Sequence, residues 1–144
     1  MIRAKHPNFE RISIDAELHQ THGLYNIDFA PELYEQYQIE ASTACDARLL
    51  SLLKDGTKDI LLDQSFYNRA WRNEVKQLAE SYRARWVLLY LKATKDTLWR
   101  RIQERKAGER NADAAFDVTE KVFERYWHGF EAPENEGEIV IEVM

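Results

Sequence analysis

Two aspartates, Asp15 and Asp63, each close a short segment that the residue pattern predicts to be a strand. A carboxylate at the end of a strand can accept a proton from a substrate hydroxyl, or hold a magnesium ion directly or through water. Aspartate is also common in the turns that follow strands, where its role is structural. The two residues are therefore candidates for acid–base and metal chemistry, with a turn residue as the alternative for each.

Four arginines gather around a polar segment at 106–117, which contains Gly108 and is predicted to be a mobile loop. Guanidinium groups on such a segment can clamp phosphate oxygens and offset the charge of a phosphoryl group in transfer. Glu104 and Glu109 interleave with them, so the alternative is a solvated helix face with local ion pairs. The four are Arg100, Arg101, Arg105 and Arg110.

Arg69 and Arg72 follow the predicted strand that ends at Asp63, and they form a second cationic pair. This pair could bind an anionic substrate, or it could simply be exposed on the first turn of a helix. Other reactive residue types give weaker signals. His19 and His22, with Glu17, lack the helical spacing of zinc peptidases and a further set of ligands, so a metal site there is not expected. Cys45 lies on the apolar side of a predicted helix, and we expect it in the core.

Strands and helices alternate along the chain, and these elements must position the candidate residues. Apolar spacing predicts helices over 32–55, 69–82, 95–105 and 119–130, and strands over 9–15, 58–63, 86–91 and 138–143, with a loop-like stretch at 16–29. Two of the strands are apolar throughout, which is typical of strands covered on both faces. The order predicts an α/β fold in which helices on both faces enclose a parallel sheet in three layers. Ligands bind such sheets beyond the carboxyl ends of the strands.

Composition limits the classes of protein that the chain can belong to. Its 144 residues suit one domain, and 44% hydrophobic residues suffice for a core. The net charge of −5 argues against nucleic acid or an anionic membrane as the main partner. A single cysteine excludes an internal disulfide and favours a reducing compartment. With no apolar run long enough for a membrane span and no signal-peptide pattern, we expect a cytoplasmic protein.

Several segments together resemble a known family. They are ISID, DILLDQSFYNRAWR, WVLLYLKATKDTLWRRIQERKAGERNAD and GFEAPENEGEIVIEV, which span the chain from about Phe9 to its end. They are similar to the small P-loop kinase-like proteins of the AAA-type ATP-binding family, relatives of chloramphenicol phosphotransferase and the zeta-toxin kinases. The most specific parts are LDQSFYNRAWR and WRRIQER.

The resemblance implies a role for each candidate residue. Asp15 would be the substrate-side carboxylate and general base, and Asp63 the Walker-B-like acid near magnesium. The arginines around 106–117, with Arg105 as the catalytic one, would form a lid over the phosphates, and residues 130–137 would border the adenine. The implied cofactors are ATP and Mg²⁺, and the implied partner is a small-molecule or nucleotide hydroxyl that accepts the phosphoryl group.

One part of the family pattern is missing. The family opens with a strand and a G-x-x-x-x-G-K-[ST] loop that holds the phosphates, whereas this chain has no Gly-Lys pair and no two glycines five positions apart. We therefore expect a truncated P-loop kinase-like domain over 1–144, without the first βα unit and with impaired phosphoryl transfer. The alternative is a non-catalytic remnant that binds an anionic ligand or a protein partner.

Overall fold

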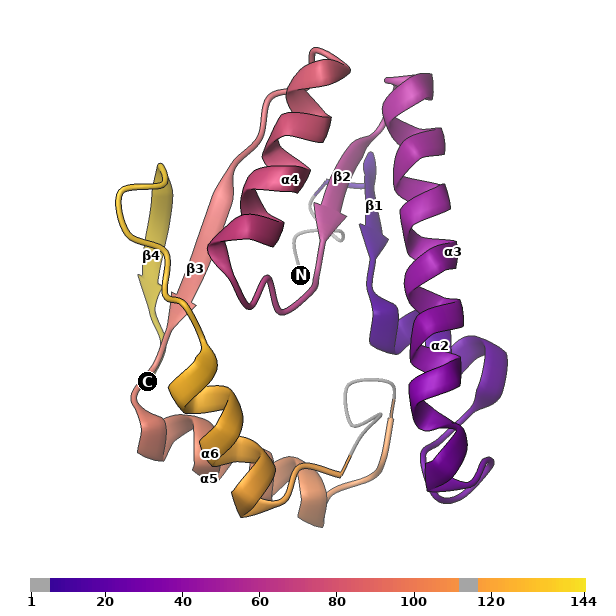
Figure 1. Cartoon of the computed structure of the whole chain (residues 1–144), viewed down its shortest axis with the longest axis vertical. Helices are drawn as coiled ribbons and strands as arrows, with labels where there is room; N and C mark the ends of the chain where they lie inside the picture. Colours follow the sequence, from indigo (N-terminus) through magenta and orange to yellow (C-terminus); the bar gives the residue numbers. More distant parts are fainter. Residues whose placement is uncertain (1–5, 112–116) are drawn as a thin grey trace. The chain divides into compact units, whose positions relative to one another are not determined.

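The computed structural model describes residues 6–111 and 117–144, which fall into two compact units. The first comprises the residues up to 65 together with 110–117, and the second comprises 66–109 together with 118–144. Each unit combines helices with one pair of parallel strands (Figure 1). The predicted α/β class with parallel strands is confirmed.

The first unit is built on the strands β1 (Phe9–Ile12) and β2 (Asp59–Leu62), which pair in parallel from Phe9↔Asp59 to Ile12↔Leu62. Between them run α2 (Ile14–His22), the short 3-10 helix η1 (Pro31–Leu33) and the long α3 (Tyr34–Asp55). Gly56 ends α3 in a left-handed conformation, with φ of 70°. The predicted end of this helix at residue 55 is confirmed.

The prediction of a strand over 9–15 and a loop over 16–29 is wrong in part, because α2 begins at Ile14. Ser13 is extended, and its hydroxyl accepts a hydrogen bond from the backbone N–H of Ala16 at 3.2 Å. Asp15 and Glu17 add negative charge to the first turn, where the helix dipole favours it. Alternation of apolar residues continues past Ile12, but the N-cap decides the conformation there.

The core of this unit lies between α2 and the start of α3. Leu18, Phe29 and Ala41 are buried, and the side chains packed against them are mostly aromatic: Ile14, Tyr25, Tyr34 and Tyr37. Cys45 is also buried, as predicted, and it faces away from solvent on α3. Burial of these side chains fixes α2 against α3 and so fixes the position of Asp15 on the first turn of α2.

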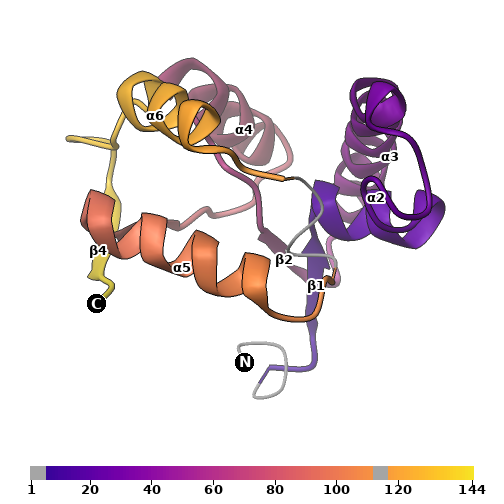
Figure 2. The same cartoon turned by 90° about the horizontal axis from the view of Figure 1, so that it is seen from below.

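The second unit contains α4 (Arg69–Ser81), β3 (Leu88–Lys92), α5 (Lys95–Ala107), α6 (Glu120–Gly129) and β4 (Glu138–Glu142), and Figure 2 gives a second view of them. Side-chain oxygens of Asn68, Thr94 and Thr119 cap the three helices. For α5, the hydroxyl of Thr94 accepts a hydrogen bond from the backbone N–H of Thr97 at 3.2 Å.

The expectation that β3 is covered on both faces is wrong for the described structure. Leu89 and Leu91 are 42% and 63% exposed, and they lie on the same face as Ile139 and Ile141, their partners in β4. β3 pairs with one strand, β4, and the exposed fractions of these four side chains show that this side of the pair is largely open to solvent. We call Val87, Leu89, Leu91, Ile139 and Ile141 the exposed sheet face.

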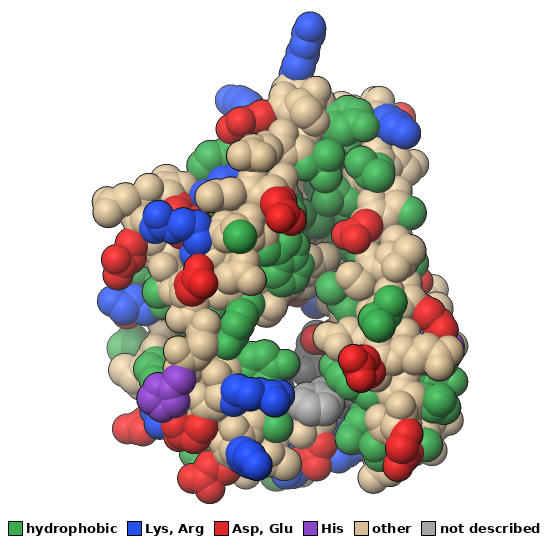
Figure 3. All heavy atoms as spheres, in the orientation of Figure 1, with side chains coloured by type: hydrophobic (Ala, Val, Ile, Leu, Met, Phe, Trp, Pro, Cys, Tyr) green, Lys and Arg blue, Asp and Glu red, His purple; other side chains and the backbone are tan. Residues whose placement is uncertain are grey.

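Acidic and basic side chains are interspersed over the surface that Figure 3 shows. Among the described residues, no helix is both long enough and apolar enough to cross a membrane.

Candidate functional site

Asp63 follows β2 directly, and its backbone N–H donates to the carbonyl of Ile12 at 2.9 Å, which extends the pairing of the two strands. Its side chain accepts two hydrogen bonds on Oδ2 from Arg11, one from Nε at 2.9 Å and one from Nη2 at 2.5 Å. Arg11 pairs with Leu61 across the sheet, and Asp63 is two residues further along, so both side chains lie on the same face.

Asp15 is exposed on the first turn of α2, at the end of the sheet where β1 finishes. Because β1 and β2 are parallel and in register to Ile12↔Leu62, Asp15 and Asp63 follow the carboxyl ends of neighbouring strands. The sequence predicted this shared edge for the two carboxylates. It missed Arg11, because only the strand register brings that residue to Asp63.

His22 of the first unit contacts an aromatic ring and a carboxylate. His22 stacks on the ring of Tyr37 with centroids 3.5 Å apart, and its Nε2 lies 3.0 Å from Oε2 of Glu40. Hydrogen bonds from Gln36 and then from His22 lower the pKa of Glu40. Within residues 6–111 and 117–144 no group of three or more His, Cys, Asp or Glu side chains is placed to hold a metal ion.

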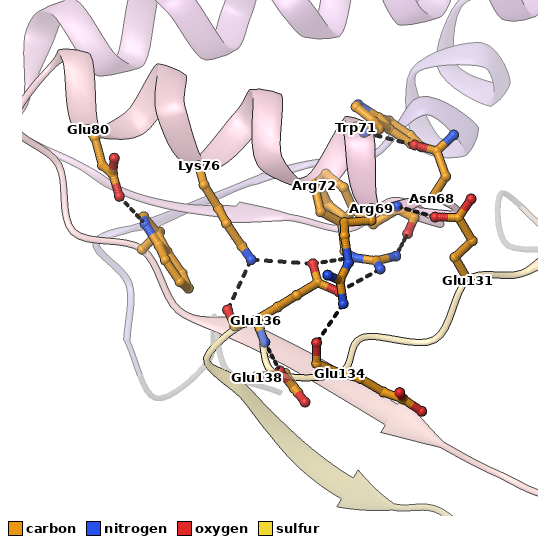
Figure 4. A network of polar contacts seen from close by, with 12 residues as sticks. Asn68, Arg69, Trp71, Arg72, Lys76, Glu80, Glu131, Glu134, Glu136 and Glu138 are labelled. Carbon is orange, nitrogen blue, oxygen red and sulfur yellow. Dashed lines mark hydrogen bonds and ion pairs between the residues drawn. The ribbon is translucent and has the colours of Figure 1, made fainter.

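Arg72 is buried in the second unit, and Figure 4 shows the polar contacts around it. Its side chain is 1% exposed, and it donates from Nε and Nη2 to the carboxylate of Glu136 at 3.0 and 2.7 Å. A third hydrogen bond runs from Nη1 to the carbonyl of Phe66 at 2.8 Å. This arrangement differs from both sequence expectations for Arg72, an anion-binding group and an exposed residue, because a charged loop residue far along the chain folds over it.

Glu136 is the centre of this network. Its side chain is 4% exposed. Its backbone carbonyl accepts a hydrogen bond from Nζ of Lys76 at 3.0 Å. The hydrogen bonds from Arg72, more than any other contact, lower the pKa of Glu136 to about 2, and the nearby charges of Lys76 and Arg69 act in the same direction. The carboxylate is therefore ionised across the physiological range.

Arg69 remains half exposed but is also engaged by the loop between α6 and β4. Its backbone N–H donates to Oε2 of Glu131 at 2.9 Å, and its Nη2 donates to the carbonyl of Glu134 at 2.6 Å. The loop at 130–137 is thus fastened to the first two turns of α4 through Arg69, Arg72 and Lys76.

The arginines of α5 divide between two sides of the helix. Arg101 and Arg105, four residues apart, line an open groove of about 640 Å³ between α5 and α6, with Leu98, Ile102, Glu104 and Phe123. Arg101 also donates to the carbonyl of Met144 at 2.8 Å. Arg100 does not line this groove, and its Nε lies 3.8 Å from Oε1 of Glu104. Arg110 belongs to the first unit, where it donates to the carbonyl of Tyr25 at 3.0 Å.

A comparison with protein families matches residues 2–133 to a model described as an AAA domain. The chain belongs to this P-loop kinase-like AAA family. No curated protein matches the chain. Membership in the AAA family indicates a nucleotide-binding function of the P-loop kinase-like kind, with nucleotide and Mg²⁺ as the cofactors that such proteins use in general.

The first unit offers one exposed carboxylate, that of Asp63, toward a magnesium ion. Magnesium takes oxygen ligands, keeps several waters and is usually bound through one or two carboxylates together with substrate phosphates. Asp63 supplies one such carboxylate, exposed at the strand end, with Oδ2 taken by Arg11. Asp63 is therefore the residue that would hold the ion, and phosphate oxygens would have to complete the site.

Proposed function

We propose that this chain is a P-loop kinase-like, ATP-dependent phosphotransferase that acts on a small-molecule or nucleotide hydroxyl. The observation that carries the proposal is the placement of Asp15 and Asp63 after neighbouring parallel strands in a chain of the AAA family. One carboxylate for the acceptor proton and one for the metal are the groups that phosphoryl transfer needs at this edge.

Each residue has a proposed role. Asp15 accepts the proton of the attacking hydroxyl, and Asp63 orients magnesium. Arg105 and Arg101 offset charge on the phosphates, and Arg69 contacts an anionic part of the substrate. When bound, ATP supplies the phosphoryl group and Mg²⁺ supplies charge for its oxygens. Arg72 is left out of the groups that touch ligand, because its guanidinium does not reach solvent.

Transfer by these 144 residues is proposed to be impaired, because the sequence lacks the glycine-rich loop whose backbone N–H groups hold the phosphates.

A second candidate function is a non-catalytic domain that binds an anionic ligand or a protein. The observation that favours it is that two of the candidate residues form ion pairs within the chain: Asp63 with Arg11, and Arg72 with Glu136. In this case the AAA ancestry accounts for the residue pattern, and no phosphoryl transfer occurs.

Calorimetric titration of the chain with Mg-ATP, together with a thermal melt, tests the proposal. We expect weak binding, with a small shift that the variant Asp63→Asn abolishes. Ligand at a hundred times its dissociation constant stabilises a folded binder by about 2.7 kcal/mol. Micromolar affinity would contradict the proposed impairment. No heat and no shift at millimolar Mg-ATP would favour the non-catalytic function.

A second assay separates catalysis from binding. Transfer of labelled phosphate from ATP to a panel of small-molecule and nucleoside hydroxyls should be slow and should depend on Asp15. Asp15→Asn should lower turnover at least about a hundredfold, the usual range for loss of a general base, and leave the affinity for ATP unchanged. Equal loss of turnover and of ATP affinity would contradict the role of Asp15 as the base.

A further inference from the structure

Arg11 donates hydrogen bonds to only one oxygen of the Asp63 carboxylate, Oδ2. Both of its hydrogen bonds, from Nε at 2.9 Å and Nη2 at 2.5 Å, end on Oδ2. Among the residues that the structure describes, Oδ1 of Asp63 accepts no hydrogen bond. An ordinary bidentate pair would use both oxygens, so this geometry leaves Oδ1 as the atom that a further ligand can reach.

The charge of the pair has a direct consequence for cations. With Arg11 in place, the positive guanidinium offsets the negative charge of the Asp63 carboxylate, so a free divalent ion that approaches Oδ1 is attracted less strongly. An ion that arrives with nucleotide phosphates brings its own anionic ligands and depends less on the charge of Asp63. Arg11 therefore weakens binding of the free ion more than binding of the ion–nucleotide complex.

We propose that Arg11 is a positioning residue for Asp63, which holds Oδ2, presents Oδ1 and makes binding of a divalent cation depend on nucleotide. The inference rests on the proposed function, because it assigns to Asp63 the magnesium role named there. It adds a residue, Arg11, that neither the sequence pattern nor the family match points to, and it adds a form of regulation to the site: the free ion is disfavoured until phosphates accompany it.

A second ion pair, between Arg48 and Glu10, provides a matched control, because Glu10 is the residue next to Arg11 in β1. Arg48 of α3 pairs with Glu10 of β1 through a single hydrogen bond from Nη2 to Oε2 at 2.7 Å. Glu10 and Arg11 are consecutive in the strand, so their side chains point to opposite faces of the sheet. Removing Arg48 exposes a carboxylate of the same strand without altering Asp63, and Arg48→Gln should leave cation binding at Asp63 unchanged.

The test uses Mn²⁺ alone as the probe, with the free ion followed by electron paramagnetic resonance in titrations of the full chain. Arg11→Gln should bind Mn²⁺ about three- to tenfold more tightly than the wild-type chain, the range expected for removing one nearby charge at an exposed site. Asp63→Asn in the Arg11→Gln background should abolish the gain, and Arg48→Gln should show none. Equal affinity of Arg11→Gln and wild type, including no measurable binding by either, would overturn the inference.

A further variant guards against a folding artefact. Arg11→Lys keeps the positive charge and removes the two-donor fork, so its Mn²⁺ affinity should stay within about twofold of wild type while Arg11→Gln rises. Equal gains in both variants would show that local unfolding, not charge, exposes Asp63, and would overturn the inference. A gain in Arg11→Gln that survives Asp63→Asn would instead contradict the magnesium role of Asp63 in the proposed function. Mg-ATP calorimetry on the same variants reports separately on nucleotide binding.

Discussion

At the scale of single residues, the close approach of Tyr67 to Gly129 shows how tightly the end of α6 is packed. A Cβ atom added at Gly129 would lie 2.9 Å from Cζ of Tyr67 and closer still to its hydroxyl oxygen. The Tyr67 ring in turn packs edge-on against Tyr126, with centroids 5.7 Å apart, and against Phe130. Glycine is needed here for space, although its backbone conformation is helical.

Gly129→Ala should therefore destabilise the chain by about 1–3 kcal/mol, because Tyr67 has to leave its packed position. Helix propensity alone would predict the opposite change in stability, because it favours alanine over glycine by about 1 kcal/mol. Chemical denaturation followed by circular dichroism measures the change in the free energy of unfolding.

Two variants serve as controls for this substitution. Gly108→Ala places its Cβ 3.6 Å from the nearest atom, an ordinary contact, and should be neutral or slightly stabilising. Tyr67→Phe combined with Gly129→Ala removes the hydroxyl in the way and should recover part of the loss. Stability of Gly129→Ala equal to wild type would show that the contact relaxes at no cost.

The single residues also show where local pattern is a sufficient guide. Asp63 was predicted at the end of a strand and lies there, because an apolar run followed by a charged residue is a local signal. The partner of Asp63, Arg11, lies 52 positions away in sequence, and nothing local in either segment indicates the pairing.

At the scale of elements, the loop at 130–137 and the helix α4 behave as one piece because Glu136 joins them. The carboxylate accepts from Arg72 and lies 3.5 Å from Lys76, with all three side chains largely buried. A buried pair adds little compared with apolar residues of the same shape, but removing one partner leaves the other charge buried and unpaired.

Glu136→Gln should lower the free energy of unfolding by about 3 kcal/mol at pH 7, since it leaves the Arg72 guanidinium buried without a counter-charge. Hydrogen exchange should then increase along the loop and the first turns of α4. Glu142→Gln is the control: its partner Lys92 is 3.7 Å away at an exposed position, so the change should stay within about 0.5 kcal/mol.

The same residue sets a pH dependence with a definite sign. The pKa of Glu136 falls from 4.5 to about 2 on folding, so its contribution is complete above about pH 4.5 and is lost as the pH falls towards 2. The wild-type chain should lose stability over this interval more steeply than Glu136→Gln. Parallel acid curves for the two chains would contradict the ion pair.

The elements also show which sequence signals are reliable. The prediction for α4 placed its start at Arg69 and its end within a residue of Ser81, because Asn68 caps it and its apolar spacing is regular. The start of α2 was missed. A strand-like alternation runs through Ser13 to Asp15, and the hydrogen bond from Ala16 to Ser13 outweighs it.

At the scale of the whole molecule, the exposed fraction of each apolar side chain indicates how much that side chain contributes to stability. Leu18 is completely buried in the core of the first unit, whereas Leu91 of β3 is 63% exposed. Both are leucines in regular structure, so they form a matched pair for measuring what burial contributes.

Leu18→Ala should destabilise the chain by about 2–5 kcal/mol, the range for truncating a fully buried leucine. Leu91→Thr on the exposed sheet face should change stability by less than about 0.5 kcal/mol and reduce aggregation of the chain. Denaturation and light scattering measure the two effects. A loss of 2 kcal/mol or more in Leu91→Thr would mean that this face is covered in solution, contrary to the structure.

The sequence by itself determined the types of the elements other than α2, most of their ends, the α/β class and the edge at which Asp15 and Asp63 lie. These features depend on residue spacing, caps and charge within a few positions along the chain. Tertiary structure alone decided that Arg11 neutralises Asp63, that Arg72 is buried by Glu136, and that Arg101 and Arg105 share a groove without Arg100. These depend on strand register and on the path of a loop, which bring together residues up to 64 positions apart and leave no periodic trace in the sequence.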